Sequence, residues 1–400
     1  MTSSERFPWG AVSLLGVLTI VGYGTWHYSF GVLLEPILTD TGWSEEWLVS
    51  AFSATGLIGA FAAPLAGRMI DRQRFRAALG VTGVVAAAGL TLASTTDSLV
   101  VFVLSTGVAG SMVAAFALYH VTQTLAVRYA PTKAARSVSV LTWWGAFAST
   151  IYLPFTAYLV DAADWRVALR VLAIIAGVYL VVAAFALPAP PRTDTVEQTR
   201  GLAFLVEPEV RRYAIASFGC GAAIGIVLVY QVTIMTLAGL SLTAAAWLAG
   251  ARGVAQFVGR LPVIWLAERL GSKRSLQIAY AAIAIGCGVL AFAVNPLIGL
   301  VYVVIGGFGI GATSPLVGIH SSQIFPPDRL GQGMGSMSLV FGLAMALGPT
   351  SIALIADGET VRWLGPTIAA GGALLAVAMM AERRPVSADR GRGARPLAEG

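Results

Sequence analysis

The chain has 400 residues, of which 57% are hydrophobic and 12% are charged. Because an ordinary soluble domain is about a quarter charged, this composition excludes a soluble globular protein, whose core could not hide so much apolar surface. The charges gather in short breaks between apolar runs, and each run is long enough to cross a bilayer core of about 30 Å as a helix. The sequence therefore predicts an all-α membrane protein that crosses the bilayer many times.

Twelve apolar runs are predicted to be transmembrane helices, because lipid cannot hydrogen-bond an open backbone and the runs lack the alternating polar pattern of a barrel strand. In chain order they cover residues 9–34, 47–67, 77–94, 99–126, 138–160, 167–187, 213–237, 244–267, 275–293, 297–325, 332–356 and 363–381. The first run is too long for the apolar core of a signal peptide, so it is expected to remain attached.

A polar segment rich in proline and mixed charge divides the twelve runs into two groups of six. It covers residues 188–212 and is predicted to be a cytoplasmic linker between two pseudo-symmetric halves, 1–187 and 213–382. The last residues, 383–400, are basic and are expected to form a disordered cytoplasmic tail.

Three landmarks repeat along the chain at an offset of about 200 residues. The pairs are Asp71-Arg72 with Glu268-Arg269, His120 with His320, and Pro154 with Pro349. A duplicated helical half implies a substrate site where the halves meet, with alternating access as one half rocks on the other.

The basic residues are distributed unevenly between the two sides of the predicted membrane. Of the 26 Lys and Arg residues, 21 fall on the side of the N-terminus and three on the opposite side. This bias predicts that both termini are cytoplasmic and that the protein lies in the cytoplasmic membrane. It also explains the net charge of +6 without a nucleic-acid partner. Cys220 and Cys287 lie inside predicted helices, where they are expected to be buried residues without a disulfide or a metal.

The loop after the second helix, Gly67-x-x-x-Asp71-Arg72-x-x-x-Arg76, resembles the signature loop of the major facilitator superfamily. The family usually has glycine where this chain has Arg74, so the turn is expected to differ there. The resemblance implies a carrier fold and a latch in which the acid faces a helix N-terminus and an arginine fork. An alternative is that the arginines only supply positive charge on the inner side. The gating residues predicted from both copies of the loop are Gly67, Asp71, Arg72, Arg76, Glu268 and Arg269. The pair Trp165-Arg166 also resembles a family feature that precedes the sixth helix.

Ionisable residues inside the predicted helices are few, and none of the deep ones is acidic. They are Arg252, Arg260, His27, His120 and His320. A buried unpaired arginine costs several kcal/mol, so it must face water, a hydrogen-bonded network or an anionic substrate. Arg252, Gln256 and Arg260 fall within about 80° on one helix face. We therefore expect an organic anion as the substrate, with Arg260 as its main anchor, because a guanidinium binds a carboxylate through two parallel hydrogen bonds. The alternative is that both arginines bond to backbone carbonyls of broken helices.

A second resemblance, to the monocarboxylate and oxalate:formate branch, rests on the segments 28–32, 42–44 and 63–72. That branch has an arginine that binds the substrate carboxylate, placed eight residues before the loop acid. Arg260 stands eight residues before Glu268 and matches this spacing. The chain departs from the branch at Gln256, which stands where animal members have a proton-linked Asp, and after the fourth helix, where Arg128-Tyr-Ala-Pro-Thr-Lys133 replaces the usual basic loop.

The histidines are predicted to couple transport to protons. In the superfamily the first, fourth, seventh and tenth helices line the cavity, so the resemblance places His27, His120 and His320 on lining helices. An imidazole with a pKa near 6.5 can take up a proton together with an anion. The alternative is that each forms an interhelical hydrogen bond. Tyr28, beside His27, stands where the branch uses a lysine. Three further candidates are Tyr119, Tyr230 and Gln231, which either form hydrogen bonds with the substrate or pack against neighbouring helices.

The predicted function is a monomeric secondary active transporter of a small organic anion, with a monocarboxylate as the expected substrate and no cofactor or metal. One alternative is efflux of a neutral or amphiphilic drug-like compound. Export of cationic drugs is not favoured, because the exporter pattern is missing at two places. Thr106 stands where proton-driven exporters carry an arginine, and Leu153 stands where they have a glycine before Pro154. A membrane enzyme is a further alternative, but the chain contains no metalloprotease, nucleophile-elbow or phosphate-loop motif.

Overall fold

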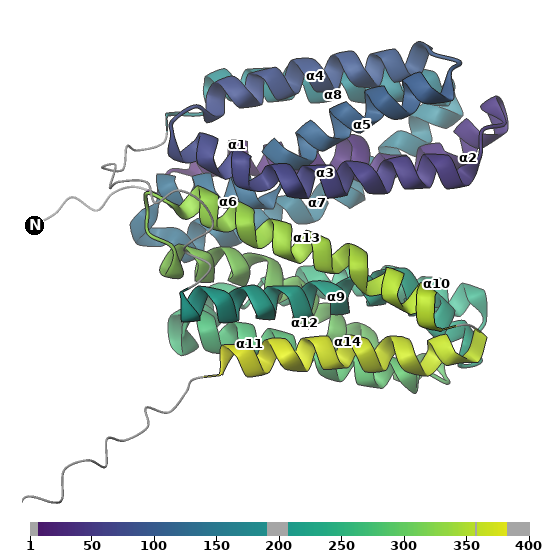
Figure 1. Cartoon of the computed structure of the whole chain (residues 1–400), viewed down its shortest axis with the longest axis vertical. Helices are drawn as coiled ribbons and strands as arrows, with labels where there is room; N and C mark the ends of the chain where they lie inside the picture. Colours follow the sequence, from purple (N-terminus) through teal and green to yellow (C-terminus); the bar gives the residue numbers. More distant parts are fainter. Residues whose placement is uncertain (1–6, 190–206, 357, 382–400) are drawn as a thin grey trace, which may run out of the picture.

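The computed structural model describes residues 7–189, 207–356 and 358–381. Within these ranges the chain is helical and forms two bundles that lie one above the other in Figure 1, the first coloured purple to teal and the second teal to yellow. Most of the predicted linker, 188–212, and the whole predicted tail, 383–400, lie outside the described residues.

The N-terminal bundle contains eight α-helices and two short non-α segments. They are α1 (Trp9–Gly22), the π-helical segment η1 (Tyr23–Tyr28), α2 (Ser29–Thr41), α3 (Glu45–Asp71), α4 (Phe75–Thr95), α5 (Leu99–Phe116), α6 (Tyr119–Tyr129), the 3-10 turn η2 (Pro131–Lys133), α7 (Ala134–Ala162) and α8 (Trp165–Ala186). The C-terminal bundle contains α9 (Pro208–Leu237), α10 (Leu242–Arg260), α11 (Val263–Ala291), α12 (Pro296–Ile324), α13 (Leu330–Ile355) and α14 (Gly358–Met380).

These helices combine into twelve transmembrane segments, which confirms the predicted fold class. The first segment is α1, η1 and α2 in succession, and the fourth is α5 followed by α6. Among the described residues, eleven stretches are long and apolar enough to cross a membrane, and α10 is the remaining helix of the bundle. The eighth segment continues past α10 to Gly271, where φ is 78° and the helical path of α11 is interrupted. The ninth segment begins after this turn.

Side chains at several helix starts fix where the segments begin. At the start of α5, α8, α10 and α12, a short polar side chain accepts a hydrogen bond from a backbone N–H of the first turn. Each such cap satisfies a donor that the helix itself cannot satisfy. The four capping residues are Ser98, Asp164, Ser241 and Asn295.

The two bundles meet closely where α3 crosses α13. A Cβ atom added to Gly67 would lie 2.0 Å from the carbonyl oxygen of Gly331, and one added to Gly335 would lie 2.3 Å from the carbonyl oxygen of Ala63. Glycine is therefore required on both helices, because any side chain would push the backbones apart. The crossing lies at the end of the molecule that carries Asp71, which is called the Asp71 end below. In Figure 1 this is the left-hand end, where α1 and α9 begin and α14 ends.

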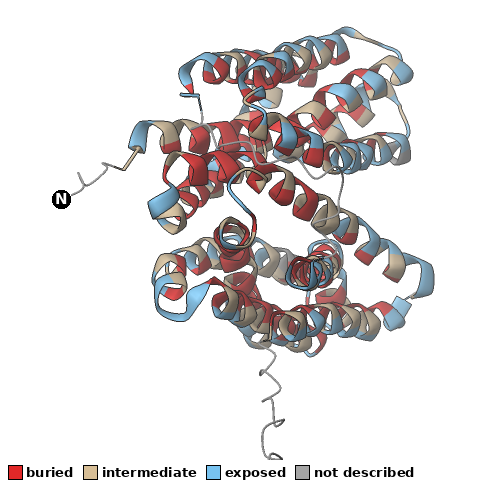
Figure 2. Ribbon diagram, turned by 60° about the vertical axis from the view of Figure 1, so that its left-hand side comes forward, coloured by how far each residue is buried: buried red, intermediate tan, exposed pale blue. Residues whose placement is uncertain are grey.

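Each bundle has its own apolar core, and the outer surface of the molecule is also apolar. Figure 2 shows the buried residues on the inner faces of the helices. Large hydrophobic side chains remain exposed on the outside, such as Phe185 at 76%, Trp247 at 77% and Leu354 at 79%. A soluble protein would not expose so many large apolar side chains, so this surface is suited to lipid.

Candidate functional site

A cavity of about 580 Å³ lies between the two bundles. The N-terminal bundle lines it mainly with η1, α3 and α6, and the C-terminal bundle with α9, α10, α12 and α13. The first, fourth, seventh and tenth transmembrane segments are therefore all lining segments, as the resemblance implied. The second, eighth and eleventh segments contribute as well.

The first transmembrane segment changes its helical winding at the cavity. The π-helical segment η1 carries Tyr23 and His27, which both line the cavity. The Nδ1 atom of His27 is buried without a hydrogen-bond partner, and its ring packs edge-on against Tyr23 and Phe52, each at 6.0 Å between centroids. A π-helical turn inside an α-helix is frequently found at a functional site. The neighbouring Tyr28 is not among the residues that line the cavity.

The fourth transmembrane segment is broken at the cavity. The predicted span over residues 99–126 corresponds to one membrane-spanning stretch, Leu99–Tyr129, but its helix is not continuous as expected, because Ala117 and Leu118 leave the helical conformation between α5 and α6. The break leaves the carbonyl oxygen of Ala115 without its α-helical donor, and Nε2 of His120 donates to it instead at 2.8 Å. The N-terminus of α6 consequently lies at the cavity, since both Tyr119 and His120 line it.

Arg260 is the last residue of α10 and also lines the cavity. Its Nη1 donates to the carbonyl oxygen of Thr142 at 2.8 Å and lies 3.5 Å from the hydroxyl of Tyr119. Its Nε is buried and has no hydrogen-bond partner. The predicted alternative of carbonyl bonding therefore accounts for one nitrogen of the guanidinium. Gln256, one turn earlier on α10, lines the cavity beside Arg260.

Arg252 does not belong to the cavity lining, although the sequence placed it on the same stripe. Its side chain is buried inside the C-terminal bundle, where Nε donates to Oε1 of Gln231 at 2.9 Å. The hydroxyl of Tyr302 donates to the same oxygen at 2.8 Å. The rotation of about 80° between Arg252 and Arg260 is enough to direct the two side chains to different neighbours. Tyr230 also lies off the cavity and donates to the carbonyl oxygen of Pro349 at 3.4 Å.

His320 lies in a hydrogen-bonded network rather than in the cavity. Its Nδ1 is 2.8 Å from Oγ of Ser272, which donates to Oε1 of Gln323 at 2.5 Å. The ring of Tyr213 packs edge-on against the imidazole at 5.0 Å. The predicted alternative of an interhelical hydrogen bond thus describes His320. The repeat-related His120 also has interhelical partners, the carbonyl oxygen of Ala115 at 2.8 Å and Oγ of Ser338 on α13 at 3.4 Å, but unlike His320 it lines the cavity.

Asp71 forms the centre of a latch between the two bundles. Its Oδ1 pairs with Arg128 and accepts from the backbone N–H of Gly331 at 3.1 Å, while Oδ2 accepts from the N–H of Gln332 at 2.9 Å. Arg128 also donates to the carbonyl oxygen of Pro327 at 3.1 Å in the other bundle. These groups, Asp71, Arg128 and the N-terminus of α13, are called the Asp71 latch. A carboxylate is stabilised both by a paired guanidinium and by the positive end of a helix dipole.

The arginine of the latch was not among the predicted gating residues. Arg128 was counted only as positive charge on the inner side, although an arginine at the end of the fourth segment was the available signal. The predicted Arg76 has another role, because it donates to the carbonyl oxygens of Ala184 and Phe185, each at 2.7 Å, and so caps α8. The left-handed turn after α3 is at Gln73, with φ of 62°, one residue before Arg74.

The second copy of the signature loop makes no corresponding latch. Glu268 is exposed and has no hydrogen bond or ion pair with any residue in the described ranges, and Arg269 stacks over the ring of Trp265 at 5.1 Å. The repeat offset of 200 residues places Asp328 where the first copy has Arg128. An acid at that place cannot pair with Glu268, so the two copies of the loop are chemically unequal.

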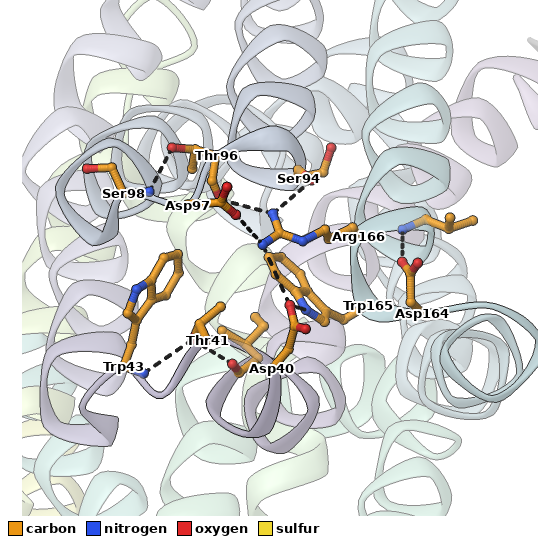
Figure 3. A network of polar contacts seen from close by, with 12 residues as sticks. Asp40, Thr41, Trp43, Ser94, Thr96, Asp97, Ser98, Asp164, Trp165 and Arg166 are labelled. Carbon is orange, nitrogen blue, oxygen red and sulfur yellow. Dashed lines mark hydrogen bonds and ion pairs between the residues drawn. The ribbon is translucent and has the colours of Figure 1, made fainter.

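A polar network ties together the loops at the other end of the N-terminal bundle (Figure 3). Arg166 pairs with Asp97 at 2.8 Å, donates to the carbonyl oxygen of Thr96 at 2.9 Å, and lies 3.6 Å from Asp40. Trp165 donates from Nε1 to Asp40 at 2.9 Å, and the guanidinium of Arg166 stacks over its ring. These contacts join the end of α2, the loop between α4 and α5, and the start of α8 within the N-terminal bundle.

Comparison with known proteins places this architecture in a family. The model of the Major Facilitator Superfamily matches residues 12–230 and 213–399, so the chain belongs to this superfamily. Its members are transporters rather than enzymes, and they bind small-molecule substrates within the membrane. The chain is therefore a multi-pass membrane transporter, as the sequence predicted.

Individual relatives agree with this placement. A stretch of 123 residues, 30% of the chain, is 32% identical to Multidrug resistance protein 3 of Bacillus subtilis (strain 168) and covers only 23% of that protein. The fold is similar to the transporter FucP in the outward conformation, with a TM-score of 0.75, 14% identity, and coverage of 92% of this chain and 97% of that one. It is also similar to the proton:xylose symporter XylE bound to 6-bromo-6-deoxy-D-glucose, with a TM-score of 0.71, 16% identity and coverage of 92% and 95%. A bacterial homologue of the iron transporter ferroportin in an outward-facing state gives a TM-score of 0.70 at 14% identity, with coverage of 92% and 98%.

Proposed function

We propose that the protein is a secondary active transporter of an organic anion, specifically a monocarboxylate, and that Arg260 binds the carboxylate. One observation carries this proposal. Arg260 is the one permanently charged side chain among the described residues that line the central cavity, and none of those residues is acidic. A guanidinium held within the membrane between two helical bundles needs an anion to offset its partial desolvation, and the lining provides none. The substrate supplies it.

The geometry around Arg260 also favours a carboxylate. One guanidinium nitrogen is held by the carbonyl of Thr142, which fixes the orientation of the fork while Nε has no protein partner. The broken fourth segment brings the N-terminus of α6 to the same cavity, where the helix dipole favours negative charge. A carboxylate between these two groups would receive charge-assisted hydrogen bonds from both sides. The spacing of Arg260 and Glu268, which resembles that of the monocarboxylate branch, agrees with this assignment.

We also propose the orientation of the protein and the state that is described. The excess of basic residues on the side of the N-terminus supports cytoplasmic termini and a place in the cytoplasmic membrane. The Asp71 end is then the cytoplasmic end, and the Asp71 latch closes it. An outward-facing conformation follows, in which the cavity receives substrate from outside. Transport requires that this latch opens and that the bundles rock to expose the cavity to the cytoplasm.

Proton coupling is assigned to the two histidines of the cavity, His27 and His120. Both face the space where the anion would bind, and protonation of either imidazole would add a positive charge beside it. His320 has a complete set of neighbours outside the cavity and is given no part in the coupling.

The function is tested by counterflow of radiolabelled monocarboxylates in proteoliposomes without ATP. Arg260→Ala is expected to lower uptake at least tenfold, because the carboxylate loses its charge-assisted hydrogen bonds. Arg170→Ala removes an exposed arginine of α8 and serves as the matched control, with uptake expected to stay at the wild-type level. Retained carboxylate uptake in Arg260→Ala would disprove the anchoring role.

A second candidate function is export of neutral amphiphilic compounds. The similarity to Multidrug resistance protein 3 over 30% of the chain and the apolar side chains of the cavity favour it. The two functions differ in their dependence on Arg260. Transport of a neutral amphiphile would continue in Arg260→Ala, whereas transport of a carboxylate would stop.

A further inference from the structure

One wall of the cavity is formed by thioether and aromatic side chains. Met334, Met337, Phe341 and Met345 of α13 all line the cavity. At about 100° per residue these four positions lie within about 80° on one helix face, so they form a continuous strip, called the methionine wall below. The strip is graded in exposure, from 2% at Met337 to 39% at Met345. The strip is therefore covered by the protein at Met334 and Met337 and opens towards its other end, at Phe341 and Met345.

Apart from the hydroxyl of Ser338 on α13, the polar groups that can bind a charged head lie on other helices. Arg260 and Gln256 come from α10, and Tyr119 comes from α6. The part of α3 that lines the cavity adds Phe52 and Leu57 to the apolar surface. The cavity thus has a polar region with one cation and a larger apolar region, and a bound molecule would meet both.

The size of the cavity indicates how much of a substrate the apolar region accommodates. A volume of about 580 Å³ is within the range of about 300–1,000 Å³ that is typical for ligands of drug size. A two- or three-carbon acid bound at Arg260 would leave the methionine wall in contact with water, which is unfavourable for apolar surface. A substrate with a larger apolar body would cover this wall and displace that water.

We infer that the transported anion is an amphipathic carboxylate, with its head on Arg260 and an aromatic or branched apolar body on the methionine wall. This inference rests on the proposed function. Methionine is flexible and polarisable, and its sulfur makes favourable contacts with aromatic rings. The wall is therefore suited to apolar bodies of several shapes, while the carboxylate requirement stays strict. Specificity is divided between the two regions of the cavity: the polar region around Arg260 selects for negative charge, and the methionine wall selects for hydrophobic size.

Binding of a series of acids to the purified full-length protein tests the inference by isothermal titration calorimetry. The series is acetate, butyrate, phenylacetate and 2-naphthylacetate, with phenylacetamide as the neutral counterpart. Each methylene that becomes buried is expected to tighten binding about fourfold. We expect naphthylacetate to bind at least tenfold more tightly than acetate, and phenylacetamide to bind at least tenfold more weakly than phenylacetate.

Two variants locate the apolar region. Met337→Gln and Met345→Gln keep the length of the side chain but make it polar, and Met345 is exposed enough that its substitution is tolerated by the fold. Each is expected to weaken naphthylacetate binding about threefold to tenfold while acetate binding is unchanged. Met379→Gln, at the end of α14 and away from the cavity, is the matched control and should change neither.

The possible outcomes separate the inference from the proposed function. Equal affinity for acetate and naphthylacetate, with both lost in Arg260→Ala, would overturn the inference and leave the proposed function standing. Equal affinity for phenylacetate and phenylacetamide, unaffected by Arg260→Ala, would overturn the proposed function itself. Tight naphthylacetate binding that needs both Arg260 and Met345 would support both.

Discussion

Asp71→Asn is expected to open the end of the molecule that the Asp71 latch closes. The side chains of Asp71 and Arg128 are only 6% and 4% exposed, so their pairing is largely shielded from water. Removing one partner of a buried pair costs about 3–5 kcal/mol, because the other charge remains buried and uncompensated. Since about 1.4 kcal/mol corresponds to a tenfold change in an equilibrium constant, the ratio of closed to open molecules should fall by about two to three and a half powers of ten.

Spin labels on the two bundles provide the assay. Cysteines introduced at Arg74 and Pro326, which are both exposed at the Asp71 end, would report the distance between the bundles by pulsed electron resonance. The native Cys220 and Cys287 are buried and would be replaced by serine or alanine first. Wild type should give mainly a short distance, and Asp71→Asn should add a longer one.

The control for this experiment removes an acid from the opposite end. Asp97 pairs with Arg166, but its side chain is 92% exposed, and both residues belong to the N-terminal bundle. Asp97→Asn should therefore leave the label distance unchanged. An unchanged distance distribution in Asp71→Asn would refute the reasoning, because it would mean that the glycine crossing closes this end without the carboxylate.

Three further predictions follow from the same structure. Gly67→Val should increase the share of molecules that show the longer distance between the same labels, because the added Cβ would lie 2.0 Å from the carbonyl oxygen of Gly331. A wild-type distance distribution would contradict this prediction. His27→Phe and His120→Gln should reduce the stimulation of uptake by an inward proton gradient, whereas His320→Gln should retain it. Uptake is measured after a pH step across the membrane of proteoliposomes. Unchanged stimulation in all three variants would reject coupling through histidine. Arg166→Ala should lower the melting temperature by roughly 2–4 °C for each kcal/mol of stability lost, because it removes an ion pair and a cation–π contact. Substrate affinity, measured by titrating substrate in the same thermal-shift assay, should be unchanged.

The fold could be predicted from the sequence because each transmembrane segment has a length and polarity that lipid dictates. The break of the fourth segment could not be predicted in the same way. Ala117 and Leu118 are ordinary helix-forming residues, with no proline or glycine to indicate the interruption. One local and one tertiary contact accompany the break: His120 bonds to the freed carbonyl of Ala115, and Gly22 on the first segment leaves room for Ala117.

The site was predicted in part, for a reason that Arg252 illustrates. Sequence spacing gives the angle of a side chain around its helix, but the neighbour that it meets depends on how helices pack. Gln256 and Arg260 point to the cavity, whereas Arg252 meets Gln231, a residue that the sequence had also proposed as a substrate contact. The sequence thus identified which polar residues are buried within the helices. It could not show which of them line the cavity and which bond to other side chains of the protein.

The unequal loops have a consequence for how this end of the molecule is held. Both copies lie at the Asp71 end, but Asp328 stands where the repeat would place a second arginine, so Glu268 adds no comparable attraction there. The electrostatic grip between the bundles is therefore carried by one copy of the repeat alone. A carrier with matched copies would keep half of that grip after losing one carboxylate, whereas this chain keeps none of it.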